Sequence, residues 1–111
     1  MSLAGNVTSM HAVIVDDMAD SCSTLTNAAD VLYRSGARKV SAVIIHPLFS
    51  ANALERISAC SINQIFFTNT VNIDECLLQF YNINYSQMDI SDLIAESVTK
   101  ILWQGFQNYG A

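Results

Sequence analysis

The chain has few charged side chains, and very few of them are cationic. Charged residues make up 14% of its 111 residues, only five are Lys or Arg, and the formal net charge at pH 7 is −5. Nucleic-acid binding depends on clustered cations that neutralise phosphates, and the sequence has no basic cluster. We therefore expect no nucleic-acid partner. A phosphate site here has to use backbone N–H groups, hydroxyls or Mg²⁺, or cations from elsewhere.

The sequence also lacks the cysteine patterns of metal sites and disulfide frameworks. Its three cysteines, Cys22, Cys60 and Cys76, are an odd number, are widely spaced and form no Cys-x-x-Cys pair. No apolar run approaches the length of a transmembrane helix, and no signal peptide opens the chain. These absences favour a cytoplasmic protein that does not bind membranes.

Apolar residues, in contrast, are abundant. They make up 51% of the chain, which is a high share for a small free-standing domain. A buried parallel sheet can use such a surplus, because its strands are covered on both faces. Alternatively, part of the apolar surface contacts a further domain or another subunit. We favour this second interpretation and expect a homo-oligomer.

Strand and helix signals alternate along the chain. Strands are predicted at 11–15, 39–45, 64–68 and within 82–88, and helices at 23–35, 51–58 and 92–103, whereas 75–81 is ambiguous. Ser23 is the expected N-cap of the first helix, and Gly36 its stop. The last helix is expected to bury Leu93, Ile94, Val98, Ile101 and Leu102. The alternation predicts one α/β domain over 1–111, with a three-layer parallel sheet flanked by helices.

Two adjacent acids follow the first strand. Asp16 and Asp17 come after an apolar run and precede a hydroxyl-rich turn and a helix. In open α/β sheets ligands bind at such strand ends, and a helix N-terminus attracts phosphate. The acids could bind ribose hydroxyls or substrate-borne Mg²⁺, form the acidic pocket of a phospho-acceptor receiver domain, or be a solvated strand end. A receiver needs a third Asp and a later Lys after its strands, but no Lys lies between Lys39 and Lys100.

The stretch Val15-Asp16-Asp17-Met18-Ala19-Asp20-Ser21-Cys22 resembles the ribose-5-phosphate loop of the ribose-phosphate pyrophosphokinase family. Further segments match that family in the same order: Ala28-Ala29-Asp30, Gly36-Ala37-Arg38-Lys39-Val40, His46 with Phe49-Ser50, Arg56-Ile57, Thr68-Asn69-Thr70, Asp89-Ile90-Ser91 and Ile94-Ala95-Glu96. The resemblance covers most of residues 5–100. It implies a type I phosphoribosyltransferase fold and a position in the C-terminal half of a two-domain enzyme subunit.

The resemblance also implies a reaction and a set of binding residues. The family transfers the diphosphoryl group of MgATP to ribose 5-phosphate, which supplies phosphoribosyl pyrophosphate for nucleotide biosynthesis and releases AMP. Asp16 and Asp17 would hold the ribose hydroxyls, directly or through Mg²⁺. The residues that would surround the 5-phosphate are Asp20, Ser21, Cys22, Ser23 and Thr24. The family's ATP-binding residues and basic catalytic loop have no counterpart here, so we expect no catalytic residue in this chain and no activity from it alone.

Two departures from the family pattern keep other functions open. Ser23 and Pro47 stand where the family has Gly, and a Cβ at Ser23 can hinder the approach of a phosphate. The alternatives are a non-catalytic regulatory relative of the synthetase and a stand-alone phosphate-binding interaction domain. Cys22 and His46 are interpreted as structural residues rather than as a nucleophile and a base.

Overall fold

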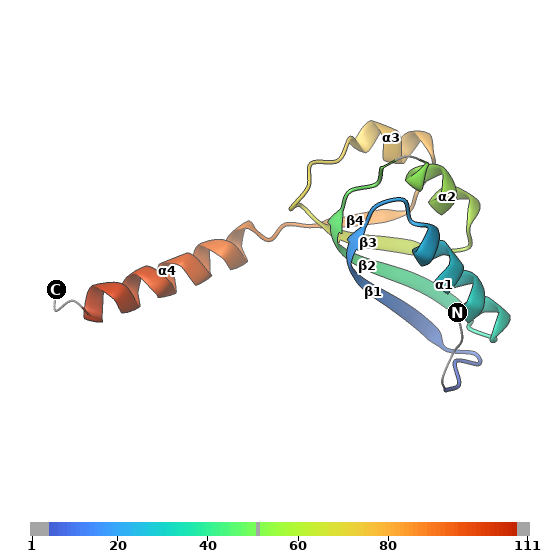
Figure 1. Ribbon diagram of the computed structural model, residues 1–111, viewed down its shortest axis with the longest axis horizontal. Coiled ribbons are helices and arrows are strands. Elements are labelled where there is room, and N and C mark those ends of the chain that lie inside the picture. The colour runs from blue at the N-terminus through green and yellow to red at the C-terminus, as the bar shows by residue number, and fades with distance from the viewer. Residues whose placement is uncertain (1–4, 51, 109–111) are drawn as a thin grey trace.

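The structure is a computed structural model that describes residues 5–50 and 52–108, and it has an α/β fold (Figure 1). Along the chain the elements are β1 (His11–Ala19), α1 (Ser23–Arg34), β2 (Lys39–Pro47), α2 (Ala53–Ala59), β3 (Gln64–Thr68), α3 (Glu75–Phe80), β4 (Tyr85–Met88) and α4 (Ser91–Asn108). The predicted alternation of strands and helices is confirmed. The ambiguous segment is the helix α3.

All four strands are parallel and lie in the order β1-β2-β3-β4. Ile14 pairs with Ala42, Ala42 with Ile65, and Ile65 with Tyr85, so these side chains share one face of the sheet. The parallel sheet with helices confirms the predicted fold class. Because the strands are parallel, all their carboxyl ends lie along one edge.

The helices α1, α2 and α3 lie on the same side of the sheet (Figure 1). Between them and the sheet is the core, to which Ile44, Ile65, Phe67, Leu54 and Leu78 contribute. Three layers were expected, but within the described residues only this one helical layer packs on the sheet. The strand order explains the difference. Right-handed crossovers that always advance in one direction place every helix on the same face.

The opposite face of the sheet carries exposed apolar side chains. Val13 is 53% exposed and Val15 is 71% exposed, and both alternate along β1 with residues of the covered face. This observation agrees with the apolar surplus of the composition.

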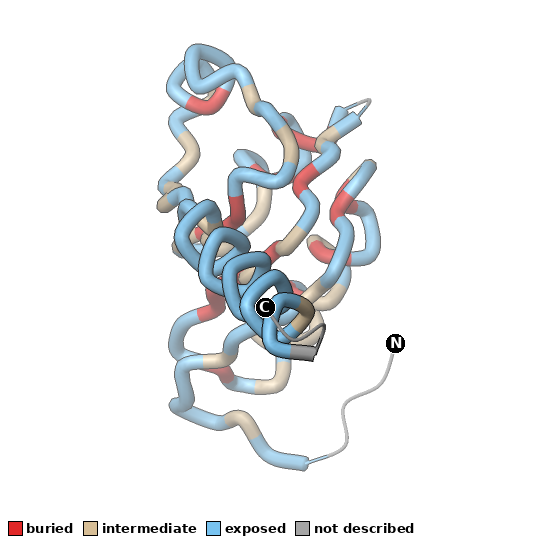
Figure 2. The backbone as a smooth tube through the Cα atoms, turned by 90° about the vertical axis from the view of Figure 1, so that its left-hand side faces the viewer, coloured by how far each residue is buried: buried red, intermediate tan, exposed pale blue. Residues whose placement is uncertain are grey.

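The helix α4 projects away from the sheet (Figure 1). Its apolar residues were predicted to be buried, and this prediction is wrong: Leu102 is 68% exposed, and the helix is coloured as exposed along nearly its whole length (Figure 2). The radius of gyration is 18.1 Å, whereas a compact domain of this length has about 13 Å. None of the described helices has the length and apolar character needed to cross a membrane.

Two element boundaries matter for the site. The strand β1 continues to Ala19 rather than stopping near residue 15, because Asp16 pairs with Ile44 and Met18 with His46. The helix α1 ends as predicted: Gly36 has a φ of 96°, and its N–H and that of Ala37 donate to the carbonyls of the last turn. The strand therefore carries the acids within it, and three residues separate its end from the start of α1.

Candidate functional site

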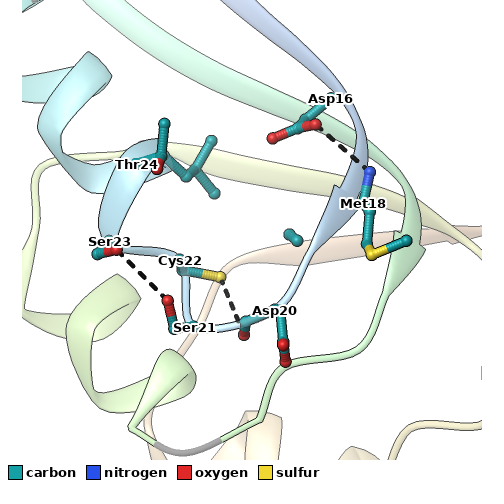
Figure 3. A pocket seen from close by; sticks show the side chains of 9 residues that line it. Asp16, Met18, Asp20, Ser21, Cys22, Ser23 and Thr24 are labelled. Atoms are coloured by element: carbon teal, nitrogen blue, oxygen red, sulfur yellow. Dashed lines mark hydrogen bonds between the residues drawn. The ribbon is translucent and has the colours of Figure 1, made fainter.

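A cavity of about 240 Å³ lies where β1 passes into α1, at the carboxyl edge of the sheet (Figure 3). It is lined by Asp16, Met18, Ala19, Asp20, Ser21, Cys22, Ser23, Thr24 and Leu25. Of the residues that the sequence nominated for substrate binding, six line this cavity, namely Asp16, Asp20, Ser21, Cys22, Ser23 and Thr24. We refer to residues 20–24 as the phosphate loop.

The first turn of α1 is arranged differently from the prediction. Ser23 was expected to be the N-cap, but the N-cap is Cys22, whose φ of 65° is left-handed and whose side chain caps no N–H. Ser23 is the first helical residue, and its hydroxyl lies 3.4 Å from that of Ser21. The backbone and hydroxyl of Thr26 both donate to the Cys22 carbonyl at 3.0 Å. These bonds hold the unusual conformation at the start of the helix.

The backbone N–H groups of residues 21–25 are available to a ligand. No hydrogen bond within the described parts of the chain uses them, as is usual for the first N–H groups of an α-helix. They lie at the positive end of the helix dipole and border the cavity. Several unsatisfied donors around one hollow form an anion-binding arrangement.

Asp16 and Asp17 do not lie together. Asp16 is half-buried and lines the cavity, and its Oδ1 accepts from the N–H of Met18 at 3.4 Å. Asp17 is exposed and is not among the lining residues, because alternation along β1 sends it to the other face of the sheet. Only one acid of the pair therefore faces the loop.

The separation of the acids limits what the site can do with a metal ion. Among residues 5–50 and 52–108, no group of three or more His, Cys, Asp or Glu side chains is placed to hold one. Asp16 provides one carboxylate, which suits Mg²⁺ whose other ligands are water and substrate oxygens. Asp17 does not fit this role in the present arrangement.

Two side chains from the segment after β2 brace the phosphate loop. The Ser50 hydroxyl donates to Oδ1 of Asp20, and Nη1 of Arg56 on α2 donates to the carbonyl of Ser21 at 2.9 Å. The side chain of Asp20 points away from Asp16, toward this segment (Figure 3). Sequence reasoning noticed Arg56 only as part of a family match and gave it no role. Its position could be found only from the order of the strands, which places α2 beside α1.

Cys22 is an inert thiol. It is 5% exposed, and burial, reinforced by the charge of Asp20, raises its pKa to about 11. The thiolate is the reactive form, and it is scarce at neutral pH. This supports the interpretation of Cys22 as a structural residue rather than a nucleophile.

His46 is engaged in a hydrogen bond at the end of β2. Its Nδ1 lies 2.9 Å from Oγ1 of Thr70, which also donates to the carbonyl of Ile45. Thr68 donates to the same carbonyl. These bonds tie the end of β2 to the segment after β3, as the structural interpretation of His46 predicts.

Comparisons with known proteins identify the family of this chain. The model of a family described as the phosphoribosyl synthetase-associated domain matches residues 1–109. The chain belongs to this family. Ribose-phosphate pyrophosphokinase 3 of Saccharomyces cerevisiae is 37% identical over 101 residues, which are 91% of this chain and 31% of that protein. A ribose-phosphate pyrophosphokinase of Coxiella burnetii is 38% identical over the same shares of the two chains.

The fold of this phosphoribosyl synthetase-associated chain is also that of a solved relative. The crystal structure of phosphoribosylpyrophosphate synthetase from Mycobacterium smegmatis superposes with a TM-score of 0.82 at 25% identity, over 91% of this chain and 33% of the other. The fold is therefore of the phosphoribosyltransferase type. The present chain spans about a third of the length of these relatives.

Proposed function

We propose that this chain is the ribose-5-phosphate-binding part of a ribose-phosphate pyrophosphokinase, in the C-terminal half of a two-domain subunit. The observation that carries the proposal is the set of N–H groups of residues 21–25 around the cavity, which form no hydrogen bond within residues 5–50 and 52–108. The names of the relatives support the reaction: transfer of the diphosphoryl group of ATP to ribose 5-phosphate, which yields AMP and phosphoribosyl pyrophosphate. The product would feed nucleotide biosynthesis.

Each part of the site has a role in this proposal. The N–H groups of residues 21–25 and the hydroxyls of Ser21 and Thr24 hold the 5-phosphate. Asp16, on the opposite side of the cavity, accepts from a ribose hydroxyl and fixes the sugar. Mg²⁺ that arrives with ATP supplies charge neutralisation. The contribution of this chain is positioning, which is a large part of catalysis in phosphoryl-type transfer.

The remainder of the proposal concerns what this chain does not contain. The ATP site and the basic catalytic loop would lie in the rest of a full-length protein, which would also cover exposed apolar side chains such as Val15 and Leu102. We propose that the complete subunit forms a homo-oligomer in the cytoplasm. The chain by itself then binds sugar phosphate without turning it over.

The test of binding is an NMR titration of the isotopically labelled chain with ribose 5-phosphate. We expect amide shifts that saturate and cluster at residues 21–25, because these N–H groups gain an acceptor. Inorganic phosphate should shift the same amides, and ribose should not, because it lacks the phosphate. Absence of shifts at these amides with saturating ribose 5-phosphate would contradict the proposal.

The test of activity uses the chain alone with MgATP, ribose 5-phosphate and inorganic phosphate. We expect AMP release no greater than that of a heat-denatured control. Release clearly above the control would show that the chain contains its own ATP site.

A regulatory relative is the second candidate, because the side chain of Ser23 lines the cavity where the family has Gly. Such a protein would bind ribose 5-phosphate without turnover even at full length. The same AMP assay on the full-length protein distinguishes the two candidates, since only the enzyme releases AMP.

A further inference from the structure

We propose that Arg56 is the positioning residue of the phosphate loop: its guanidinium fixes the loop peptide between Ser21 and Cys22 and supplies the cation that the loop itself lacks. This inference rests on the proposed function and assigns a role to a residue outside the cavity lining. Arg56 lies on α2, 35 residues from the carbonyl it contacts. The short loop and α2 are brought together only by the sheet.

The hydrogen bond from Arg56 orients the peptide group between Ser21 and Cys22. Nη1 of Arg56 donates to the Ser21 carbonyl at 2.9 Å. In a trans peptide the C=O and the following N–H point in opposite directions. Holding the Ser21 carbonyl toward α2 therefore directs the N–H of Cys22 away from α2. If this peptide rotated, a carbonyl oxygen would replace a donor in the loop and would repel an anion.

The conformation of the phosphate loop also needs support. Cys22 has a φ of 65°, and the left-handed region is unfavourable for a non-glycine residue because its Cβ approaches the following carbonyl oxygen. Thr26 donates to the carbonyl of Cys22 itself, and Arg56 donates to the carbonyl of the preceding residue, Ser21. The two sets of bonds fix the peptides on both sides of Cys22.

Arg56 also brings a positive charge close to the phosphate loop. The cavity is bordered by the carboxylates of Asp16 and Asp20, and no Lys or Arg lines it. Arg56 is close enough for its positive charge to lower the pKa of the Cys22 thiol, against the effect of burial. It forms no ion pair within the described residues, and the other N–H groups of its guanidinium have no partner there. No carboxylate of the described residues therefore lies within ion-pair distance of its guanidinium.

The experiment measures inorganic phosphate binding to the labelled chain by NMR for the original sequence, Arg56→Gln, Arg56→Lys and Arg38→Gln. Arg38→Gln is the matched control, because it removes the same exposed charge just before β2, at the opposite edge of the sheet. We expect Arg56→Gln to weaken binding by about tenfold at low salt, which is the loss of one charge-assisted interaction. Arg38→Gln should change it by less than about twofold, since exposed charges more than a Debye length apart are largely screened.

Two further readouts separate positioning from general damage. Arg56→Lys keeps the charge and a donor and should recover part of the affinity. Added salt should weaken phosphate binding more in the original sequence than in Arg56→Gln, because the screened charge is absent from the variant. In the ligand-free chain, only the Arg56 variants should shift the amide of Cys22.

The outcomes distinguish this inference from the proposed function. If the original chain binds phosphate and Arg56→Gln binds equally well, the role of Arg56 is wrong and the proposed function stands. If Arg56→Gln and Arg38→Gln weaken binding equally, the effect is one of net charge and the positioning role is wrong. If the original chain binds no phosphate, both the proposed function and this role are wrong.

Discussion

The phosphate loop and α4 both follow a strand at the carboxyl edge of the sheet, but the chain holds them in different ways. The loop is braced by side chains from the next segment, Ser50 and Arg56, and its Cys22 is buried. The helix α4 is tied through Asp89 and Asn69 at its start, and its apolar side chains are exposed. Hydrogen bonds from neighbouring elements hold the conformation of the loop. The apolar residues of α4, in contrast, have no surface to pack on within the described residues.

The largest effect that tests this comparison is the loss of leucine side chains. Leu78 on α3 is 1% exposed, whereas Leu102 on α4 is 68% exposed. We expect Leu78→Ala to lower the free energy of unfolding by about 2–5 kcal/mol, because it leaves a cavity in the core. Leu102→Ala should change it by less than about 0.5 kcal/mol.

The measurement for this pair is urea unfolding of both variants beside the original chain. The two substitutions remove the same atoms, so they are controls for each other. Equal losses of unfolding free energy would show that α4 packs on the domain in solution, and the contrast between the two regions would disappear.

The second test compares cysteines in the loop and outside it. Burial raises the pKa of Cys22 to about 11 from an ordinary 9.0, whereas Cys76 on α3 is exposed. At pH 8 the thiolate fraction of Cys22 should be about a hundredfold below that of an ordinary thiol, since each pKa unit is a factor of ten. We expect iodoacetamide to label Cys76 first, as followed by mass spectrometry of peptides.

The same pKa shift predicts a loss of stability in alkali. The unfolded chain deprotonates near the ordinary pKa and the folded chain only near 11, so this contribution to stability is complete below pH 9 and is lost as the pH rises toward 11. Cys22→Ser should reduce the loss of unfolding free energy between pH 9 and pH 11.

In the labelling experiment, rapid reaction of Cys22 with iodoacetamide at pH 8 would contradict its burial and show that the loop opens readily.

A smaller effect is expected from Ser23→Gly. Ser23 is the first helical residue rather than the N-cap, so the substitution should cost at most about 1 kcal/mol of stability, the helix propensity of glycine. If the Ser23 side chain hinders phosphate, the same change should strengthen ribose 5-phosphate binding several-fold, since removing the Cβ opens the cavity. Thermal melting and an NMR titration measure the two effects, with Ser97→Gly on α4 as the control for stability.

Unchanged or weaker binding by Ser23→Gly would mean that the serine does not obstruct the site. The main reason for considering a regulatory relative would then be removed.

The smallest expected effect lies at the junction with α4. Hydrogen bonds from the hydroxyl and N–H of Ser91, and from the amide of Asn69, hold the pKa of Asp89 below its ordinary 3.8. Its contribution to stability is therefore present above that value and is lost as the pH falls through the lowered pKa. We expect the Ser91 amide resonance to move only in this acid range. In Asp89→Asn the movement should be absent, and its persistence would assign the titration to another group.

Local patterns in the sequence predicted the elements and most of the cavity. The β-branched run within β2 and the stop at Gly36 are signals that depend on neighbouring residues, and the strand Gln64–Thr68 is confirmed without change. The six loop and strand residues of the cavity are close in sequence, so their proximity follows once the strand and helix are placed. Whether they bind ribose 5-phosphate stays a prediction.

Other features could not be predicted because they depend on long-range arrangement. Asp17 was placed with Asp16, but β1 continues past both and its alternation separates them. Arg56 reaches Ser21 only because β2 lies beside β1. The periodicity of α4 indicates an apolar face but does not say what the face contacts.

The strand order has one more consequence. β1 is the first strand in the order, and within the described residues it pairs with β2 alone. An edge strand leaves a row of backbone N–H and C=O groups without partners, and such a row can be extended by another extended peptide. The strand that carries Asp16 to the cavity is thus also the edge strand at which the sheet can be extended. A peptide that paired with β1 would lie alongside the cavity. Charged residues on β1 such as Asp17 disfavour this pairing.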